Sequence, residues 1–128
     1  MDQKMPLIDN TEVPTYDMPG VRFAPIAAPS RGSSETAMWR TRVTPHTVGI
    51  LHHMTREEII LAVAGEAVVR IGDETHPLLP GNAFAVPAFT DFRLECVGDV
   101  PFEAVVVLPV GGRGVIAGQP SFSPLWSL

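Results

Sequence analysis

Hydrophobic and polar residues alternate in short runs along this chain, and turn-forming residues separate the runs. The clearest alternation covers residues 36–43, where Ala37, Trp39, Thr41 and Val43 share one face. A period of two residues predicts half-buried β-strands. The same criteria predict about eight to ten short strands, within residues 21–26, 36–43, 48–53, 58–64, 67–71, 76–80, 83–86, 91–97 and 102–108. No segment reads as a convincing helix, so the pattern predicts an all-β sandwich or barrel.

The length of 128 residues suits one domain with a hydrophobic core. Thirteen prolines and eleven glycines, spread over the whole chain, favour many short strands joined by turns. We expect an extended N-terminal arm over residues 1–20, a β-domain over residues 21–118 and an extended C-terminal tail over residues 119–128. Trp126 is expected to pin the tail to the body of the domain, and Trp39 to pack in the core or an interface.

Charge and composition exclude several classes of function. The net charge is −5, and the nine lysines and arginines are scattered, so neither nucleic acid nor a membrane surface is an expected partner. Cys96 is the only cysteine, which excludes a disulfide framework and a cysteine-rich zinc site. No apolar run approaches the about 18 residues of a membrane span, and the first residues lack the apolar core of a signal peptide. We therefore expect a cytoplasmic protein.

Candidate chemistry is concentrated in one stretch. His52, His53, Glu57 and Glu58 fall within seven residues, and an apolar run follows them and stops at Gly65. This order is typical of a polar loop, a buried strand and a tight turn. In a regular strand neighbouring side chains point to opposite faces, so His52 and His53 would do so.

The stretch resembles the first motif of the cupin superfamily, G-x5-H-x-H-x3–4-E-x6-G. Glu58 and Gly65 match its final Glu and Gly. With His52 as the first family His, His46 stands at the leading Gly and Met54 at the second His. With the longer spacing, His53 becomes the second His and Leu51 fills the first position. The family's second motif, G-x5-P-x-G-x2-H-x3-N, is matched at Gly81 and Pro87, but its later Gly, His and Asn positions hold Phe89, Phe92 and Cys96.

The resemblance implies a jelly-roll β-barrel or sandwich. In metal-binding cupins two His and one Glu of the first motif join the His of the second motif around a divalent ion such as Fe, Mn, Ni, Cu or Zn. Phe92 cannot coordinate a metal, so no tightly bound cofactor is expected here. Asp91 is the nearest oxygen donor, but strand alternation turns it to the opposite face from Phe92.

Three functions remain open. The first is a small-molecule-binding cupin whose ligand pocket is lined by His52, Met54, Glu58 and Phe92. The second is a metal-dependent enzyme, a dioxygenase or an isomerase, whose ion is held by His52, His53 and Glu58. The third is a non-catalytic interaction module, a homodimer formed through an edge strand and the N-terminal arm. Dimerisation is also expected because the strand 59–63 is apolar on both faces, so that its outer face needs a cover. Alternation predicts one inward-facing set in the key strands: Glu58, Ile60, Ala62, Phe92, Leu94 and Cys96.

Overall fold

The computed structural model describes residues 7–128, in which eleven strands and two short 3-10 helices account for all regular structure. The strands are β1 (Tyr16–Met18), β2 (Val21–Ala27), β3 (Thr36–Val43), β4 (His53–Met54), β5 (Glu58–Ala64), β6 (Ala67–Ile71), β7 (Glu74–Leu78), β8 (Ala83–Val86), β9 (Arg93–Cys96), β10 (Phe102–Pro109) and β11 (Gly114–Val115). The 3-10 helices are η1 (Pro29–Arg31) and η2 (Leu125–Ser127). The predicted all-β class is confirmed.

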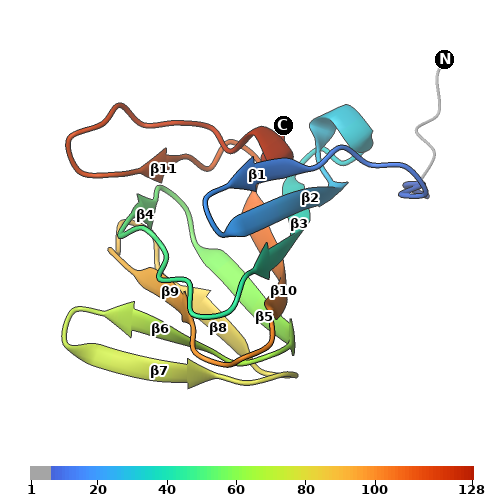
Figure 1. The fold of residues 1–128 in the computed structure, drawn as a ribbon. Helices are drawn as coiled ribbons and strands as arrows, with labels where there is room; N and C mark the ends of the chain where they lie inside the picture. Colours follow the sequence, from blue (N-terminus) through green and yellow to red (C-terminus); the bar gives the residue numbers. More distant parts are fainter. Residues whose placement is uncertain (1–6) are drawn as a thin grey trace, which may run out of the picture.

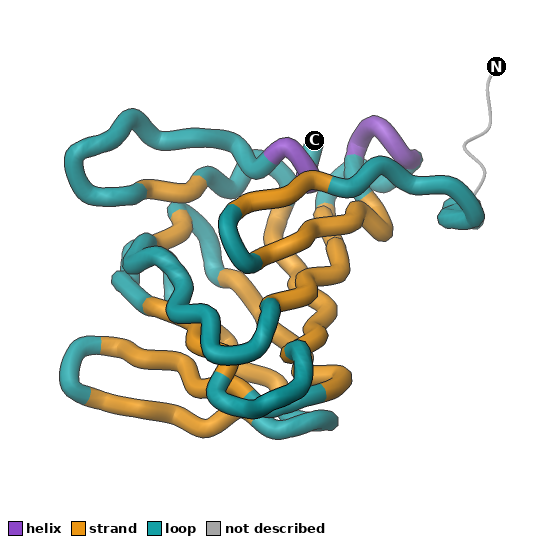
Figure 2. Tube along the Cα trace, viewed as in Figure 1, coloured by secondary structure: helices purple, strands orange, loops and turns teal. Residues whose placement is uncertain are grey.

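Three antiparallel sheets form the molecule. The largest has six strands in the order β1-β2-β3-β10-β5-β8, and it lies opposite the three-stranded sheet β7-β6-β9. Strands β11 and β4 form a third, two-stranded sheet. The β6–β7 hairpin lies at one end of the molecule, while β1, β11 and the C-terminus gather at the other end (Figure 1). Loops and strands alternate along the described residues, as the tube view shows (Figure 2).

Strict alternation places the core between the sheets. In β3 and β10 every second residue is buried, and their register pairs Trp39 with Val106 and Thr41 with Ala104. The predicted inward set is confirmed, because Glu58, Ile60, Ala62, Phe92 and Cys96 are all buried and Leu94 packs against the core. A one-residue slip would move each of these side chains to the other face, so burial holds the register.

Residues 48–53 depart from the predicted regular strand. Only His53 and Met54 are assigned to a strand, while Val48 and His52 each make an isolated bridge to the β9 side, to Glu95 and Phe92. Gly49 donates a hydrogen bond to the Leu94 carbonyl at 2.8 Å, and a Cβ at this glycine would lie 2.5 Å from that oxygen. This close backbone approach makes the segment an irregular edge that runs past β9.

The described parts of the two terminal segments contain short regular elements. Within residues 7–20, β1 pairs with Val21–Phe23 of β2, and the pairing ends before Pro25, which has no backbone N–H. Residues 1–6 of the arm lie outside the described part. Trp126 of the tail stacks on Phe23 with ring centroids 3.7 Å apart, as expected of an anchor. The turn between β6 and β7 is shorter than the predicted strands 67–71 and 76–80 implied, because β7 already begins at Glu74.

The outer face of the six-stranded sheet is apolar over β5. Ile59, Leu61 and Val63 are 38–48% exposed, although they belong to a strand in the middle of the sheet. Three arginines, at positions 22, 40 and 42, line a shallow hollow together with Val63, so they adjoin this apolar patch on the β2–β3 side. Among the described residues, no helix is long and apolar enough to cross a membrane.

Candidate functional site

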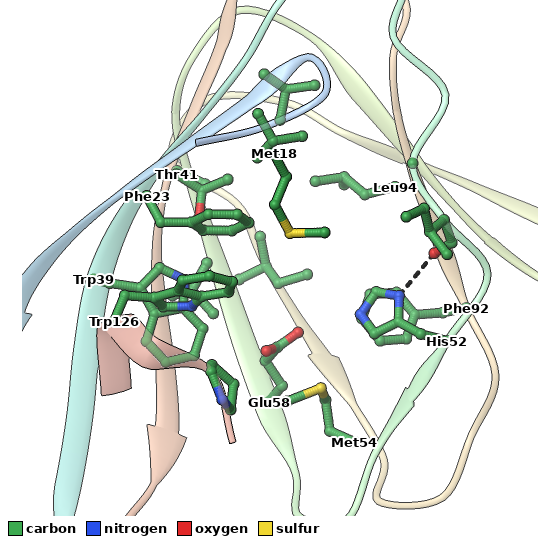
Figure 3. A pocket seen from close by; sticks show the side chains of 18 of the residues that line it. Met18, Phe23, Trp39, Thr41, His52, Met54, Glu58, Phe92, Leu94 and Trp126 are labelled. Atoms are coloured by element: carbon green, nitrogen blue, oxygen red, sulfur yellow. Dashed lines mark hydrogen bonds between the residues drawn. The ribbon is translucent and has the colours of Figure 1, made fainter. Parts of the chain in front are cut away.

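A cavity of about 280 Å³ lies between the six-stranded sheet and the β4–β9 side of the molecule. Apolar and aromatic side chains form most of its wall (Figure 3). The side chains used in the argument below are Phe23, Trp39, Thr41, His52, Met54, Glu58, Phe92, Ala104 and Trp126. Among the described lining residues, Glu58 and His52 are the ones with titratable side chains, and neither Arg nor Lys lines the cavity.

Glu58 begins β5, and strand alternation turns its carboxyl into the cavity (Figure 3). The residue is 6% exposed. Within residues 7–128 no hydrogen bond or ion pair to this carboxyl is found, so nothing compensates for its loss of water. Burial therefore raises the pKa of Glu58 to about 7. At neutral pH this carboxyl is divided between its acid and its carboxylate forms.

His52 faces the same cavity from the irregular edge. Its backbone exchanges two hydrogen bonds with Phe92, and its ring lies 4.5 Å from the Phe92 ring. Nδ1 lies 2.7 Å from the Ile50 carbonyl oxygen, which can only accept, so Nδ1 carries the proton and donates it. Burial lowers the pKa of the imidazole, and the bond to Ile50 opposes this in part. In the resulting neutral ring, Nε2 is an acceptor.

One backbone angle separates the two registers of the first motif. His46 and Phe89 are the residues other than glycine with positive φ in the described chain, at 62° and 59°. Glycine adopts such angles without strain. Phe89 stands at a glycine position of the second motif in either register, whereas His46 stands at the leading glycine of the first motif only in the register that begins with His52. The register therefore places Met54 at the second ligand position, and Met54 is buried and lines the cavity.

The expected pocket set lies together, whereas the alternative metal set does not. His52, Met54, Glu58 and Phe92 all line the cavity. His53 does not line it, and its Nδ1 instead contacts Asp91 Oδ1 at 2.9 Å on the outside. Phe92 is 1% exposed and the Asp91 side chain is 64% exposed, so the predicted orientation of these neighbours is confirmed.

A divalent metal does not fit these residues. The motif's four ligand positions hold His52, Met54, Glu58 and Phe92, which supply one imidazole and one carboxylate. Within residues 7–128 no group of three His, Cys, Asp or Glu side chains is placed to hold an ion. A stable first-row metal site needs three or four such donors with fixed geometry. His46, which contacts Asp99 at 2.9 Å, lies at the surface and adds none.

Two further polar groups in the cavity wall were not found as site residues by sequence reasoning. The Thr41 hydroxyl and the Trp126 indole nitrogen are buried, and neither has a hydrogen-bond partner within the described chain. The inward position of Thr41 followed from alternation in β3, but a threonine on a buried face is no functional signal. Trp126 reaches the cavity because the C-terminal segment folds back over it, through Phe122, Pro124 and η2.

The fold and the motif positions are those of a cupin. The family model described as "Cupin domain" matches residues 39–108, which is more than half of the chain. The chain therefore belongs to the cupin domain family.

Solved structures of the same fold cover most of this chain. The polyketide cyclase RemF from Streptomyces resistomycificus superposes with a TM-score of 0.75 and 16% identity, over 93% of this chain and 84% of the cyclase. A sugar phosphate isomerase of the cupin superfamily from Silicibacter pomeroyi superposes with a TM-score of 0.71 and 18% identity, over 89% of this chain and 83% of the isomerase.

A third structure is the salicylate 1,2-dioxygenase from Pseudaminobacter salicylatoxidans, with a TM-score of 0.68 and 19% identity. It is matched over 84% of this chain but only 33% of its own length. At these identities the structures share the fold and nothing more specific. No curated protein sequence matches this chain.

Proposed function

We propose that this cupin binds a small, largely apolar molecule in the cavity between its sheets, with Glu58 and His52 as two of the polar groups that contact it. The observation that carries this proposal is the cavity itself. Its volume of about 280 Å³ lies just below the roughly 300–1,000 Å³ typical of ligand pockets, which suits a small ligand. An apolar wall with a few convergent polar groups is the usual composition of such a site.

Similar proteins support a small-molecule role. An isomerase, a cyclase and a dioxygenase are named among the structures with this fold. One fold hosts many chemistries, so the proposal rests on the cavity and not on any one of these names.

The binding proposal is tested by filling the cavity. Ala104 lies on the cavity floor, on the inner face of β10, while its neighbour Val105 faces outward. Equilibrium dialysis with 2-acetylnaphthalene as probe should give saturable binding to the wild type. Binding should be lost in Ala104→Leu and kept in the control Val105→Leu. Equal binding to all three proteins would place the probe elsewhere and refute the proposal.

We further propose that the site works without a tightly held metal ion, because its donors are one His and one Glu. Elemental analysis of freshly purified protein should give well under one transition ion per chain, in the wild type and in His52→Ala and Glu58→Ala alike. Near-stoichiometric metal that both substitutions remove would contradict this and favour a metal-dependent enzyme.

A proton-transfer enzyme is a second candidate, favoured by the pKa of Glu58 near neutrality. In such a site the neutral imidazole of His52 accepts a proton from carbon, while the acid form of Glu58 donates one to a carbonyl oxygen. Exchange of the α-hydrogens of 2-tetralone in D2O, followed by NMR, should exceed the rate in buffer and return to it in Glu58→Gln and His52→Ala. An unchanged rate with wild-type protein would leave a binding role only.

We also propose a homodimer formed through the apolar outer face of β5. Covering Ile59, Leu61 and Val63 removes exposed apolar side chains from water. Light scattering at tens of micromolar should give the mass of a dimer, and Leu61→Glu should give that of a monomer. The control Val100→Glu places the same charge on an apolar loop residue that is more exposed than Leu61, at 58% against 39%. A wild-type monomer would contradict the proposal.

A further inference from the structure

Two buried polar groups in the cavity wall have no partner in the described chain. They are Thr41 Oγ1 and Trp126 Nε1. Buried polar groups in proteins are nearly always hydrogen-bonded, and the indole N–H of a buried Trp normally finds an acceptor. Thr41 is only 6% exposed. Thr41 and Trp126 both line the cavity, but these two atoms have almost no accessible surface in this structure. A ligand that supplies the missing partner therefore reaches them only when neighbouring side chains shift.

These two groups belong to the same part of the wall. Thr41 on β3 is the register partner of Phe23 on β2, and Trp126 stacks on Phe23 with their planes 2° apart. Thr41 and Trp126 are therefore both neighbours of Phe23. We call Phe23, Thr41 and Trp126 the tail-side corner, because the C-terminal segment completes it.

The tail-side corner is separate from Glu58. Strand β10 lies between β3 and β5, which puts Thr41 and Glu58 about 10 Å apart across the sheet. Thr41, Ala104 and Ala62 are register partners across β3, β10 and β5. Glu58 lies four residues from Ala62 on β5, which adds a separation of about 13 Å along the strand direction. The close-up shows the same separation, with apolar side chains between the two places (Figure 3).

The chemistry of the corner restricts what it can accept. An indole N–H only donates, so its partner must be an acceptor, while a hydroxyl donates or accepts. No Arg or Lys lines the cavity among the described residues, so an anionic group would lose its water without gaining a counter-charge. The faces of Phe23, Trp126 and Trp39 favour a flat apolar body beside that acceptor.

We propose that the tail-side corner is the specificity subsite of this cupin, and that its ligand is a neutral, flat, largely apolar molecule whose carbonyl or hydroxyl oxygen accepts hydrogen bonds from Trp126 and Thr41. This proposal rests on the proposed function, since it needs ligand binding in the same cavity.

A matched pair of probes isolates the acceptor. 2-Acetylnaphthalene and 2-ethylnaphthalene have nearly the same shape and differ in one carbonyl oxygen. Their dissociation constants are measured by equilibrium dialysis against the wild type, Thr41→Val and Trp126→Phe. Thr36→Val, at an exposed position on the outer face of the same strand, is the control.

The preference for the acetyl over the ethyl compound should fall about fivefold in each of the variants Thr41→Val and Trp126→Phe, which is the effect of losing one hydrogen bond. The control should leave it unchanged. The anion 2-naphthoate should bind the wild type at least about tenfold more weakly than 2-acetylnaphthalene. Without ligand, Thr41→Val should melt about 3–5 °C higher, because it removes an unpartnered buried hydroxyl and keeps the shape of the side chain.

The outcomes separate the two proposals. If both naphthalenes bind in the cavity but their ratio is the same in all four proteins, the specificity subsite is refuted and the binding proposal stands. If 2-naphthoate binds as tightly as the ketone, the neutral-ligand assignment is refuted. If neither naphthalene binds the wild type, the proposed function fails as well. Trp126→Phe and Thr41→Val are independent, so a folding defect in the first leaves the second as the test.

Discussion

The two sides of the cavity differ in how they are built. On the motif side, His52, Met54 and Glu58 lie within seven residues of sequence, and Glu58 and His52 change charge with pH. On the tail side, Thr41 and Trp126 are far apart in sequence, and both are neutral at every physiological pH. The motif side therefore supplies groups that gain or lose protons, whereas the tail side supplies fixed hydrogen-bond partners.

This difference predicts separate roles. Changes on the motif side should alter how the protein depends on pH, and changes on the tail side should alter packing and ligand preference independently of pH. The following substitutions test the contrast, beginning with the largest expected effect.

Trp126→Ala should cost the most stability. The substitution removes the ring that stacks on Phe23 and lies 6.3 Å from Trp39, and a large cavity would replace it. We expect the free energy of unfolding to fall by about 3–5 kcal/mol, at pH 5 and pH 8 alike. Urea denaturation measures it, with the exposed neighbour Leu125→Ala as control, which should change stability by less than about 0.5 kcal/mol. A similar small loss in both variants would mean that the tail does not anchor the fold.

Glu58→Gln should remove a pH dependence of stability. The folded pKa is about 7 and the ordinary value is 4.5, so below pH 4.5 both states hold the proton and the contribution is fully present. As the pH rises to 7 the unfolded chain loses its proton first, and stability falls by about 3 kcal/mol in all. Glu58→Gln has no such proton to lose, so its stability relative to the wild type should improve by that amount between pH 4 and pH 8.

The titration of His52 does not interfere with this test. Its folded pKa is lowered, so its effect has the opposite sign: stability falls as the pH drops below 6.5, where the unfolded imidazole takes up a proton. Both the wild type and Glu58→Gln contain His52, so the difference between them isolates Glu58. A parallel pH dependence in the two proteins would show that Glu58 is solvated and would remove the basis for its role in the cavity.

Phe89→Gly should give a small gain. Phe89 has a φ of 59° and is 70% exposed, so the strain of its backbone is not offset by burial. Glycine relieves about 1–2 kcal/mol of strain and costs about 0.5–1 kcal/mol in unfolded-state entropy, which leaves up to about 1 kcal/mol. Gly81→Ala is the mirror control, because Gly81 has a φ of 92° with open space around it and should lose stability. A loss of stability in Phe89→Gly would mean that the Phe89 ring makes a stabilising contact.

Much of the fold followed from the sequence because alternation and burial act locally. The buried faces of β3 and β5 were predicted correctly, since each of these strands has one buried face. Residues 48–53 were not, because their path is set by the close approach of Gly49 to Leu94, which the pattern of this segment does not contain. The strand β1 was missed because its pairing with β2 depends on how the chain turns at Gly20.

The site was predictable only on the motif side. The residues of the expected pocket set were found from the motif spacing, and the positive φ angle of His46 then favoured the register that begins with His52. The tail side gave no such signal, because Thr41 and Trp126 become neighbours of the cavity only when the last residues of the chain stack on Phe23. Long-range packing of this kind is not encoded in local spacing.

A crystal structure of the protein with 2-acetylnaphthalene, prepared without chelators, tests the central claim most directly. The account predicts the naphthalene rings inside the cavity, with the carbonyl oxygen within hydrogen-bonding distance of both Trp126 Nε1 and Thr41 Oγ1. It also predicts no metal density between His52 and Glu58. A probe bound outside the cavity, or an ion coordinated by His52 and Glu58, would contradict it.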